Sequence, residues 1–328
     1  MRAILYEQTG PAHDVLRLAE VPTPQPGPGE VRVRLAWSGV NPSDVKQRAG
    51  RRTRTLAWPR IIPHSDGSGV IDCVGDGVDQ ARVGERVWVW NAGWQRAHGT
   101  AAEHVTLPSE QAVVLPDHIS LEAGACLGIP ALTACHAVHV NGGVADQQVL
   151  IAGGAGAVGH YAIQFARLRG ARRIITTVSS DAKAAIALQA GADDVINYRT
   201  ESVAERVAAI TDGQGVDRVI EVESAGNIGL DTEILRPDGD LVIYGSDAET
   251  VNIPFFPAIL KNLRVQFFIV YTLNAQARSA AISGLNDLLH NNTSLHPIAA
   301  RFPLEQTADA HDLIDSGQAI GNVIIRLD

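Results

Sequence analysis

The segment that decides the fold is VLIAGGAGAVG at residues 149–159, in which an apolar run leads into three glycines spaced three apart. Gly153, Gly156 and Gly159 allow the backbone to turn tightly and to approach a charged group closely. The apolar run predicts a buried strand, and residues 156–169 predict a helix that begins in the turn. The N–H groups and positive dipole at such a helix start favour a pyrophosphate. The segment therefore predicts a dinucleotide site, provided that strands and helices alternate around it.

The surrounding sequence supplies that alternation. Short apolar runs predict buried parallel strands at 173–178, 218–222 and 241–244, with a helix at 182–190. Strands that alternate with helices predict a doubly wound parallel sheet of the Rossmann type. Residues before about 120 differ, because short alternating segments at 31–36, 67–75 and 84–90 are separated by turn residues and predict a mostly-β region. After the sheet we expect a strand at 263–270, a helix at 275–290 and a closing strand at 323–327.

Composition narrows the class of protein. The 328 residues suffice for two domains, and 45% hydrophobic with 19% charged residues is typical of a globular protein. The net charge of −9 disfavours nucleic-acid binding. The start of the chain lacks the apolar core of a signal peptide, and no apolar run reaches the ~18 residues of a membrane span, so we expect a cytoplasmic location. We expect Cys73, Cys126 and Cys135 to be buried, reduced thiols.

The end of the second strand predicts which nucleotide binds. In this fold an acidic residue there binds the ribose 2′-OH of NAD. Here the sequence is TVSSDAK at 177–183, where the only acid, Asp181, comes late and Lys183 follows in the next helix. Lys183 is either a ligand of a 2′-phosphate or an ordinary cation on a helix surface. Because the chain has only two other lysines, Lys46 and Lys261, we favour the phosphate role and predict NADPH rather than NADH.

Seven motifs then point to a family. They are PGPGEV at 26–31, GVNPSD at 39–44, SDGSGV at 65–70, GERV at 84–87, GIPALTA at 128–134, the glycine turn, and GADDVINY at 191–198. In their order and spacing the chain resembles the zeta-crystallin-like quinone oxidoreductases of the medium-chain dehydrogenase/reductase superfamily along nearly its full length. The resemblance implies a GroES-like, mostly-β catalytic domain of residues 1–122 and 271–328, into which a Rossmann domain of residues 123–270 is inserted. It also implies a homodimer or homotetramer, in which strand 263–270 is the sheet edge that pairs with a two-fold mate.

The resemblance also assigns cofactor contacts and shows one departure. Near the nicotinamide it implies Asn41 and Thr133. It implies a pyrophosphate cradle formed by Gly153, Ala155, Gly156, Ala157, Val158 and Gly159. It implies an adenosine-phosphate pocket formed by Ser179, Lys183 and Tyr198. It implies further contacts in two later loops, at Gly245 and Ser246 and at Ile269 and Val270. The departure follows residues 48–50, where Arg51 and Arg52 replace a tyrosine that covers the nicotinamide. Arg52 is therefore a candidate contact of cofactor or substrate.

The residues at the positions of a catalytic zinc do not suit the metal. Zinc-dependent relatives use a Cys, a His and a further Cys or acid. Here the cysteine position is Asn41, and Ser65 aligns with the histidine. His64 is displaced by one residue, and we interpret it as a structural hydrogen bonder rather than a ligand. Residues 94–104 contain no cysteine for a structural zinc cluster. We therefore expect no metal site.

Direct hydride transfer from NADPH to a quinone is the chemistry that remains when metal and nucleophile are absent. Asn41 is positioned to orient the nicotinamide, and Asp44, His64 and Arg52 are candidates to polarise the substrate oxygen, with water an equal alternative as proton donor. One rival function is reduction of α,β-unsaturated carbonyls such as alkenals or enoyl thioesters. Another is an NADPH-binding crystallin-like or RNA-binding protein with little turnover. The arginines of residues 48–60 form a basic cluster, which is either a solvated loop or an anion site.

Overall fold

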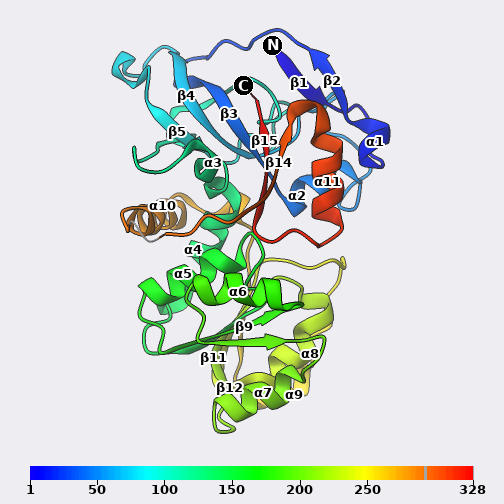
Figure 1. Cartoon of the computed structure of the whole chain (residues 1–328), viewed down its shortest axis with the longest axis vertical. Coiled ribbons are helices and arrows are strands. Elements are labelled where there is room, and N and C mark those ends of the chain that lie inside the picture. Colours follow the sequence, from blue (N-terminus) through cyan, green and yellow to red (C-terminus); the bar gives the residue numbers. More distant parts are fainter. Residues whose placement is uncertain (292–293, 328) are drawn as a thin grey trace. The chain divides into compact units, whose positions relative to one another are not determined.

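The computed structural model describes residues 1–291 and 294–327, whose contacts divide into two compact units (Figure 1). Unit 1 comprises Met1–Pro130 and His296–Asp328, and unit 2 comprises Ala131–Leu295. The sequence placed the domain boundaries earlier, at 122/123 and 270/271. The second boundary differs because helix α10 (Ala275–Leu289) packs against helices α4 and α5 of unit 2.

Unit 2 alternates strands with helices. Its strands are β8 (Gln148–Ile151), β9 (Arg173–Val178), β10 (Asp194–Asn197), β11 (Val216–Glu221), β12 (Leu235–Ile243) and β13 (Arg264–Phe267). Its α-helices are α4 (Leu132–His139), α5 (Gly159–Leu168), α6 (Asp181–Gln189), α7 (Val203–Ile210), α8 (Ser224–Ile234), α9 (Phe255–Leu260) and α10, with 3₁₀ turns η4 (Val140–Gly142) and η5 (Val270–Thr272). The doubly wound pattern predicted from the sequence is therefore confirmed.

The six strands form one parallel sheet in the order β10-β9-β8-β11-β12-β13. The order reverses at β8, which lies beside both β9 and β11, and ligands of such sheets bind at the carboxyl ends of the strands next to this reversal. Helix α5 packs with α4 and α6, while α8 packs with α7 and α9, and the two groups cover opposite faces of the sheet (Figure 1). Apolar residues of β8 such as Val149 and Ile151 are fully buried between these layers.

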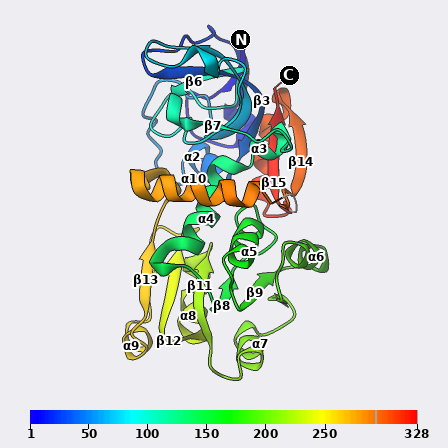
Figure 2. The same ribbon diagram turned by 90° about the vertical axis from the view of Figure 1, so that its left-hand side faces the viewer.

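Strand β13 ends the sheet. It pairs only with β12, and Figure 2 shows it at the margin of unit 2 beside α9. The sequence predicted a longer edge strand at 263–270, of which residues 264–267 pair, and residues 270–272 form the turn η5 instead. The edge position itself is confirmed.

Unit 1 is mostly β, as the sequence predicted. Its strands are β1 (Arg2–Leu5), β2 (Arg17–Glu20), β3 (Glu30–Val40), β4 (Asp66–Val74), β5 (Arg86–Val89), β6 (His104–Pro108), β7 (Ala112–Val114), β14 (Ile298–Pro303) and β15 (Asn322–Arg326). Its helical segments are α1 (Ala12–Val15), α2 (Pro42–Arg48), η1 (Gln80–Arg82), η2 (Ser109–Gln111), α3 (Leu121–Gly124), η3 (Leu127–Ala131), η6 (Leu304–Gln306) and α11 (Thr307–Asp315). A seven-stranded sheet runs β14-β15-β3-β4-β5-β7, with β6 also on β3, and β1 pairs with β2 in a separate ribbon.

The C-terminal part of unit 1 completes its sheet. Strand β15 pairs antiparallel with β3, so residues 322–326 lie beside residues 37–40. This pairing explains why a segment that follows unit 2 in the sequence belongs to unit 1. Of the three cysteines, none is disulfide-bonded; Cys126 and Cys135 are buried, whereas Cys73 is half-buried and differs from the prediction. No helix among residues 1–291 and 294–327 is both long and apolar enough to cross a membrane.

Candidate active site

The glycine turn of unit 2 joins β8 to α5 and is tied to the neighbouring strand β9. The backbone N–H of Gly153 donates to Thr177 Oγ1 at 3.2 Å, and that of Gly154 donates to the Thr177 carbonyl at 3.1 Å. Gly153 itself has φ +69°, which an L side chain rarely adopts, and its carbonyl accepts the N–H of Gly156 at 2.9 Å. The turn is therefore held in one shape by its own backbone and by the end of β9.

Two of the glycines have no room for a side chain. A Cβ on Gly154 would lie 2.1 Å from Thr176 Oγ1, and a Cβ on Gly159 would lie 2.2 Å from the carbonyl oxygen of Gly153. Such distances are shorter than van der Waals contact, so the turn in this shape requires glycine at both positions. Gly159 is also the first residue of α5, and the turn thus passes directly against the start of the helix.

The same turn presents unused backbone donors. The N–H groups of Ala155, Ala157, Val158 and Gly159 have no hydrogen-bond acceptor among residues 1–291 and 294–327. Such N–H groups at the start of a ten-residue helix, together with the helix dipole, form a site for a phosphate group. These four residues therefore fit the pyrophosphate of a dinucleotide. All four belong to the cradle that the sequence predicted at Gly153, Ala155, Gly156, Ala157, Val158 and Gly159.

The residues predicted for the adenosine phosphate come together beside the ends of β9 and β10. Ser179 follows β9, and Ser180 caps α6 by accepting the N–H of Lys183 at 3.4 Å. Tyr198 follows β10, and its N–H donates to the carbonyl of Val178 at 3.1 Å. Ser179, Lys183 and Tyr198 thus share one edge of the sheet, and the Tyr198 side chain is half exposed there.

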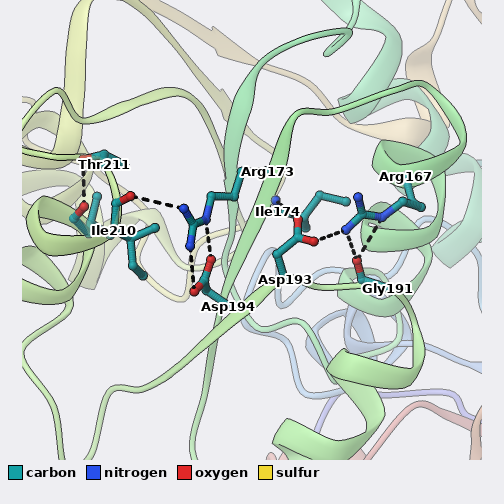
Figure 3. A network of polar contacts seen from close by, with 9 residues as sticks. Arg167, Arg173, Ile174, Gly191, Asp193, Asp194, Ile210 and Thr211 are labelled. Carbon is teal, nitrogen blue, oxygen red and sulfur yellow. Dashed lines mark hydrogen bonds and ion pairs between the residues drawn. The ribbon is translucent and has the colours of Figure 1, made fainter.

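A polar network holds β10 in place (Figure 3). Asp193 accepts Arg167 Nη2 of α5 at 2.5 Å and the N–H of Ile174 of β9 at 2.8 Å. Asp194 accepts Arg173 Nε at 2.6 Å, which adds a second link between β9 and β10. The two adjacent acids of the GADDVINY motif therefore fix the register of β10, and with it the position of Tyr198 at the end of that strand.

The later predicted loops also lie at the carboxyl ends of strands. Gly245 follows β12 and approaches the chain after β11 closely, because a Cβ on it would lie 2.2 Å from the Val222 carbonyl. Ser246 Oγ accepts the N–H of Ala248 at 3.1 Å, which stabilises the same loop. Ile269 and Val270 follow β13, where Val270 is buried. Thr133, the remaining predicted contact of unit 2, is buried on α4.

A buried acid pair at the end of β11 escaped the sequence analysis. Glu221 Oε1 accepts the N–H of Glu223 at 2.5 Å and Asn227 Nδ2 at 3.1 Å. Burial, and then the charge of Glu221, raise the pKa of Asp231 of α8 to about 9. Burial also raises the pKa of Glu221. Asp231 therefore keeps its proton at neutral pH, so the pair adds no second negative charge at the strand end next to the cradle.

In unit 1, Asn41 lies between two buried carboxyl groups. Its Nδ2 donates to Asp66 Oδ1 of β4 at 2.6 Å, and its backbone N–H donates to Asp44 Oδ2 in the first turn of α2 at 2.8 Å. Asp66 Oδ2 accepts the backbone N–H of Ile129 at 3.1 Å. Asn41, Asp44 and Asp66 are all buried. The bond from Asn41 Nδ2 to Asp66 holds the Asn41 side chain in one orientation.

Both carboxyl groups hold protons more tightly than usual. Burial raises the pKa of Asp44 to about 7, while hydrogen bonds from Asn41 and the charge of Arg52 limit the rise. Burial, and then the nearby Asp44, raise the pKa of Asp66 well above its ordinary range. Both groups therefore favour the protonated form more than an exposed acid does, and Asp44 is close to its midpoint at neutral pH. A carboxyl group at its midpoint is suited to giving up a proton near pH 7.

His64, the third candidate of unit 1, is used by the fold. Its Nδ1 bonds Ser38 Oγ at 2.9 Å and its Nε2 bonds His311 Nε2 of α11 at 2.9 Å. Both rings are buried, and burial lowers the pKa of His64 to about 3. His64 also has φ +77°, a strained backbone for a residue with a side chain. Since neither ring nitrogen remains available, His64 takes no part in the mechanism proposed below.

The direction of every hydrogen bond in this chain of side chains can be assigned. Thr100 Oγ1 donates its only hydrogen to the Asp66 carbonyl at 2.7 Å, so it accepts from Ser38 Oγ at 2.8 Å. Ser38 must then accept from His64 Nδ1, and neutral His64 must accept from His311 at Nε2. Each histidine therefore has one tautomer, and the chain joins α11 to β3 and β4 beside Asp66.

Arg52 lies in the exposed loop after α2, close enough for its charge to act on Asp44. Its neighbour Arg51 instead pairs with Asp315 of α11, with Nη2 at 2.7 and 2.8 Å from the two carboxylate oxygens. The two neighbouring arginines therefore differ in role: Arg51 holds the loop through Asp315, whereas the side chain of Arg52 is exposed to solvent.

Known proteins share both units. Residues 157–288 match the family model described as zinc-binding dehydrogenase, and residues 27–117 match the alcohol dehydrogenase GroES-like domain. A quinone oxidoreductase of Mus musculus is 30% identical over 334 residues, which cover all of this chain and 98% of that protein. The chain belongs to the quinone oxidoreductase family. That family lies within the medium-chain dehydrogenase/reductase superfamily, as the sequence motifs predicted.

Two further relatives refine the comparison. A 2-haloacrylate reductase of Burkholderia sp is 30% identical over 335 residues, covering 99% of this chain and 98% of that protein. The structure of the Escherichia coli quinone oxidoreductase complexed with NADPH superposes with a TM-score of 0.87 at 25% identity, covering 99% of this chain and 100% of that one. The inserted Rossmann sheet and the GroES-like unit predicted from the sequence are therefore confirmed as features of this quinone oxidoreductase family member.

The description of one matching family model names zinc as a ligand. Within residues 1–291 and 294–327 no group of three or more His, Cys, Asp and Glu side chains is placed to hold a metal ion. The position of the zinc-binding cysteine is occupied by Asn41, which donates a hydrogen bond to Asp66. The position of the zinc-binding histidine is occupied by Ser65, which is buried. The adjacent His64 uses both ring nitrogens in hydrogen bonds within the fold.

Proposed function

We propose that this protein is an NADPH-dependent reductase that reduces a quinone without a metal ion. The observation that carries the proposal is the cradle of four unused backbone N–H groups at the start of α5. Next to it, Ser179 follows the end of β9, where an NAD-binding acid would stand, and Lys183 lies in the first turn of α6. The NADPH named for the Escherichia coli relative's structure supports the same cofactor. Free Cys73, Cys126 and Cys135 fit a reducing compartment, and we place the enzyme in the cytoplasm.

The chain's residues bind and orient, and bound NADPH supplies the hydride that the acceptor receives. The N–H groups from Ala155 to Gly159 hold the pyrophosphate, and Lys183 with Ser179 and Tyr198 holds the 2′-phosphate. Asn41 has one Nδ2 hydrogen beyond its bond to Asp66, and we assign that hydrogen to orienting the nicotinamide. Asp44 holds a proton at its carboxyl group and is our candidate source for the proton that follows.

A second candidate function is reduction of a carbon–carbon double bond in an α,β-unsaturated carbonyl. The relative named 2-haloacrylate reductase favours it, because that name describes an alkene conjugated with a carboxyl group. A panel of a quinone, an enal and an enoyl thioester, followed by NADPH absorbance, separates the two functions. If kcat/KM is larger for the quinone than for the enal and the thioester, the first function is supported. A larger value for the enal or thioester replaces it with the second, and no turnover of any acceptor rejects both.

The proposed reaction needs no zinc because the donor set does not suit the metal. Asn41 and Ser65 are neutral, weak ligands at the two positions where thiolate and imidazole would be needed. Purified protein is expected to contain much less than one zinc per chain by elemental analysis, and to keep its quinone turnover after treatment with a chelator. Stoichiometric zinc whose removal abolishes turnover contradicts this part of the proposal.

Lys183→Ala is expected to lower kcat/KM for NADPH by about 10- to 100-fold, because a charge-assisted bond to phosphate contributes roughly 1.5–3 kcal/mol. The value for NADH should change by less than about twofold, since NADH has no 2′-phosphate for the ammonium group to bind. Initial rates with both nucleotides measure the ratio, and NADH serves as the internal control. An equal loss with both nucleotides contradicts the assignment of Lys183 to the 2′-phosphate.

Asp44→Asn is expected to remove a pH dependence from the reaction. Protonated Asp44 is the active form, so wild-type kcat should fall as the pH rises through about 7, the pKa of this carboxyl group. The variant should be slower by about 10²- to 10⁴-fold, the usual contribution of a positioned acid, and flat over this range. The loss should be larger with an enal than with a quinone, because the enal needs a proton on carbon.

Asparagine retains an oxygen that accepts the Asn41 N–H, so the turn at the start of α2 can be kept. NADPH affinity, measured by fluorescence titration, is the control and should stay within about twofold of wild type. A variant that keeps the wild-type slope of kcat against pH leaves water as the proton donor.

We also propose a homo-oligomer assembled through the β13 edge, as the family resemblance implies. Helix α9 beside this edge exposes Phe255 by 72% and Phe256 by 69%, which is unusual for large apolar side chains of a monomer. Light scattering is expected to give a dimer or tetramer for wild type and a smaller species for Phe255→Asp/Phe256→Asp. The control is Val114→Asp on β7 of unit 1, where an exposed apolar residue is also replaced. A wild-type monomer at all concentrations contradicts the proposal.

A further inference from the structure

The loop after α2 is the most basic part of an acidic chain. Residues 48–60 contain five arginines and no acidic residue, although the whole chain has a net charge of −9. The arginines are Arg48, Arg51, Arg52, Arg54 and Arg60. Such a concentration of one sign of charge gives a local positive potential, which attracts anions at a distance.

Two of these arginines hold the start of the loop. Arg48 is buried, and its Nη1 donates to the carbonyl of Gly10 at 2.6 Å. Arg51 Nη2 contacts both carboxylate oxygens of Asp315. At the other end, Ile61 exchanges two backbone hydrogen bonds with Tyr6, each at 2.9 Å. Both ends of the loop are therefore fixed to the body of unit 1, and the residues between them are presented on a defined support.

The other three arginines are exposed and unpaired. Arg52, Arg54 and Arg60 have no ion-pair partner within the part of the chain that the structure describes. The loop that carries them is fixed at both ends, at its start by Arg48 and Arg51 and at its end by the backbone bonds between Ile61 and Tyr6. Because the support is already ordered, a ligand that binds these guanidinium groups loses less conformational freedom than it would on a mobile loop.

Two features show what kind of ligand would fit. Arg52 lies near Asp44, whose carboxyl group accepts the N–H of Asn41, so one end of the loop is close to the candidate proton source. Arg54 lines a shallow hollow together with Leu56, Trp58 and Glu7. Apolar side chains next to a guanidinium suit a flat, apolar molecule that ends in an anionic group. The carboxylate of Glu7 repels an anion, so the anionic group is expected on the side of Arg54 that faces away from Glu7.

We propose that Arg52 and Arg54 select electron acceptors that carry an anionic group, with the reducible part of the acceptor toward Asn41 and Asp44. The proposal rests on the proposed reductase function and adds the substrate class. A guanidinium binds a carboxylate, sulfonate or phosphate through two parallel hydrogen bonds, which a lysine cannot reproduce. Neutral quinones are reduced as well, but with a higher KM.

The test compares 1,4-naphthoquinone with its 2-sulfonate in the holoenzyme at low salt. For each protein the measured quantity is the ratio of kcat/KM for the sulfonate to that for the neutral quinone. The wild-type ratio is then divided by the ratio for Arg52→Gln/Arg54→Gln to give a quotient. The difference in reduction potential between the two quinones affects both ratios equally and cancels in this quotient. We expect this quotient to be about 5 or more, because two exposed guanidinium–anion contacts contribute up to about 1 kcal/mol each. Arg54→Gln alone should give an intermediate quotient.

The matched control is Arg34→Gln, which removes an exposed arginine from β3 of the same unit and should give a quotient near one. Raising the salt concentration should lower the sulfonate's kcat/KM for wild type, with a smaller effect on the double variant. Crotonate, crotonyl-CoA and crotonaldehyde form a second series: preference for crotonate identifies a carboxylate, and preference for the thioester identifies the phosphates of its carrier.

A quotient within about twofold of one for the double variant overturns the proposal, as does an equal loss in Arg34→Gln. Either result leaves the reductase function intact if wild type still reduces neutral naphthoquinone with NADPH. Absence of that turnover instead rejects the proposed function, so the two failures are distinguishable.

Discussion

Gly159→Ala is expected to weaken NADPH binding by about 100-fold or more, because displacing a positioned contact by about 1 Å commonly costs this factor. The added Cβ would lie 2.2 Å from the carbonyl oxygen of Gly153 and 2.9 Å from Gly154 Cα. Both are backbone atoms, so no side-chain rotation relieves the clash. Either the start of α5 or the whole turn must move, and the N–H groups of Ala157 and Val158 move with it.

Fluorescence titration with NADPH measures the dissociation constant, and circular dichroism checks that the variant is folded. The control is Gly229→Ala in α8, where a Cβ meets no atom within 4 Å. Alanine there should leave NADPH affinity unchanged and slightly stabilise the helix. If Gly159→Ala bound NADPH as wild type does, the turn would not be the phosphate site.

Arg218→Met is expected to lower the free energy of unfolding by about 3–5 kcal/mol, as removing one partner of a buried ion pair usually does. Arg218 is completely buried in β11, and its Nη2 contacts Asp240 Oδ2 at 2.8 Å. Its Nη1 also donates to the carbonyl of Val138 in the last turn of α4 at 3.1 Å. Methionine fills similar space but leaves this carbonyl without a donor, and leaves Asp240 with the exposed Arg264 alone.

Urea unfolding followed by circular dichroism measures the loss. Arg236→Met is the control, because Arg236 pairs with Asp217 at 2.6 Å with half its side chain exposed. Exposed pairs contribute about 0–1 kcal/mol, so this variant should be nearly as stable as wild type. Similar effects of the two substitutions would mean that Asp240 finds another partner when Arg218 is removed.

The nucleotide-binding unit was predictable because its signals are local. Strand β9 coincides with the predicted 173–178, since the β-branched residues 174–178 lie between Arg173 and Ser179. Strand β12 was predicted at 241–244 but begins at Leu235, because Asp238 and Gly239 resemble a turn. The structure accommodates them in an irregular section, where the pairing with β11 passes from Leu235 to Asp240 and Asp238 has φ +60°.

The buried polar pairs were not predictable from local patterns. Asn41 meets Asp66 across 25 positions of sequence, and His64 meets His311 across 247. Periodicity indicates which face of a strand is buried, but it does not indicate which buried polar group on another element will be its partner. Asp66 stood within a motif used for family resemblance, and only the fold showed that it orients Asn41. The roles assigned to the site residues remain predictions that the variants above test.

The position of Asn41 between two carboxyl groups has a consequence for how this enzyme can evolve. Replacing it with cysteine, as a first step toward a metal-binding ancestor or design, would remove the donor that Asp66 Oδ1 receives in the protein interior. A buried polar group that loses its partner lowers the free energy of unfolding by about 1–3 kcal/mol, and this loss occurs before a metal site is complete. Histidine at Ser65 would be needed as well, at a buried position next to strained His64. Single substitutions that introduce zinc ligands at these positions are therefore expected to give less stable proteins.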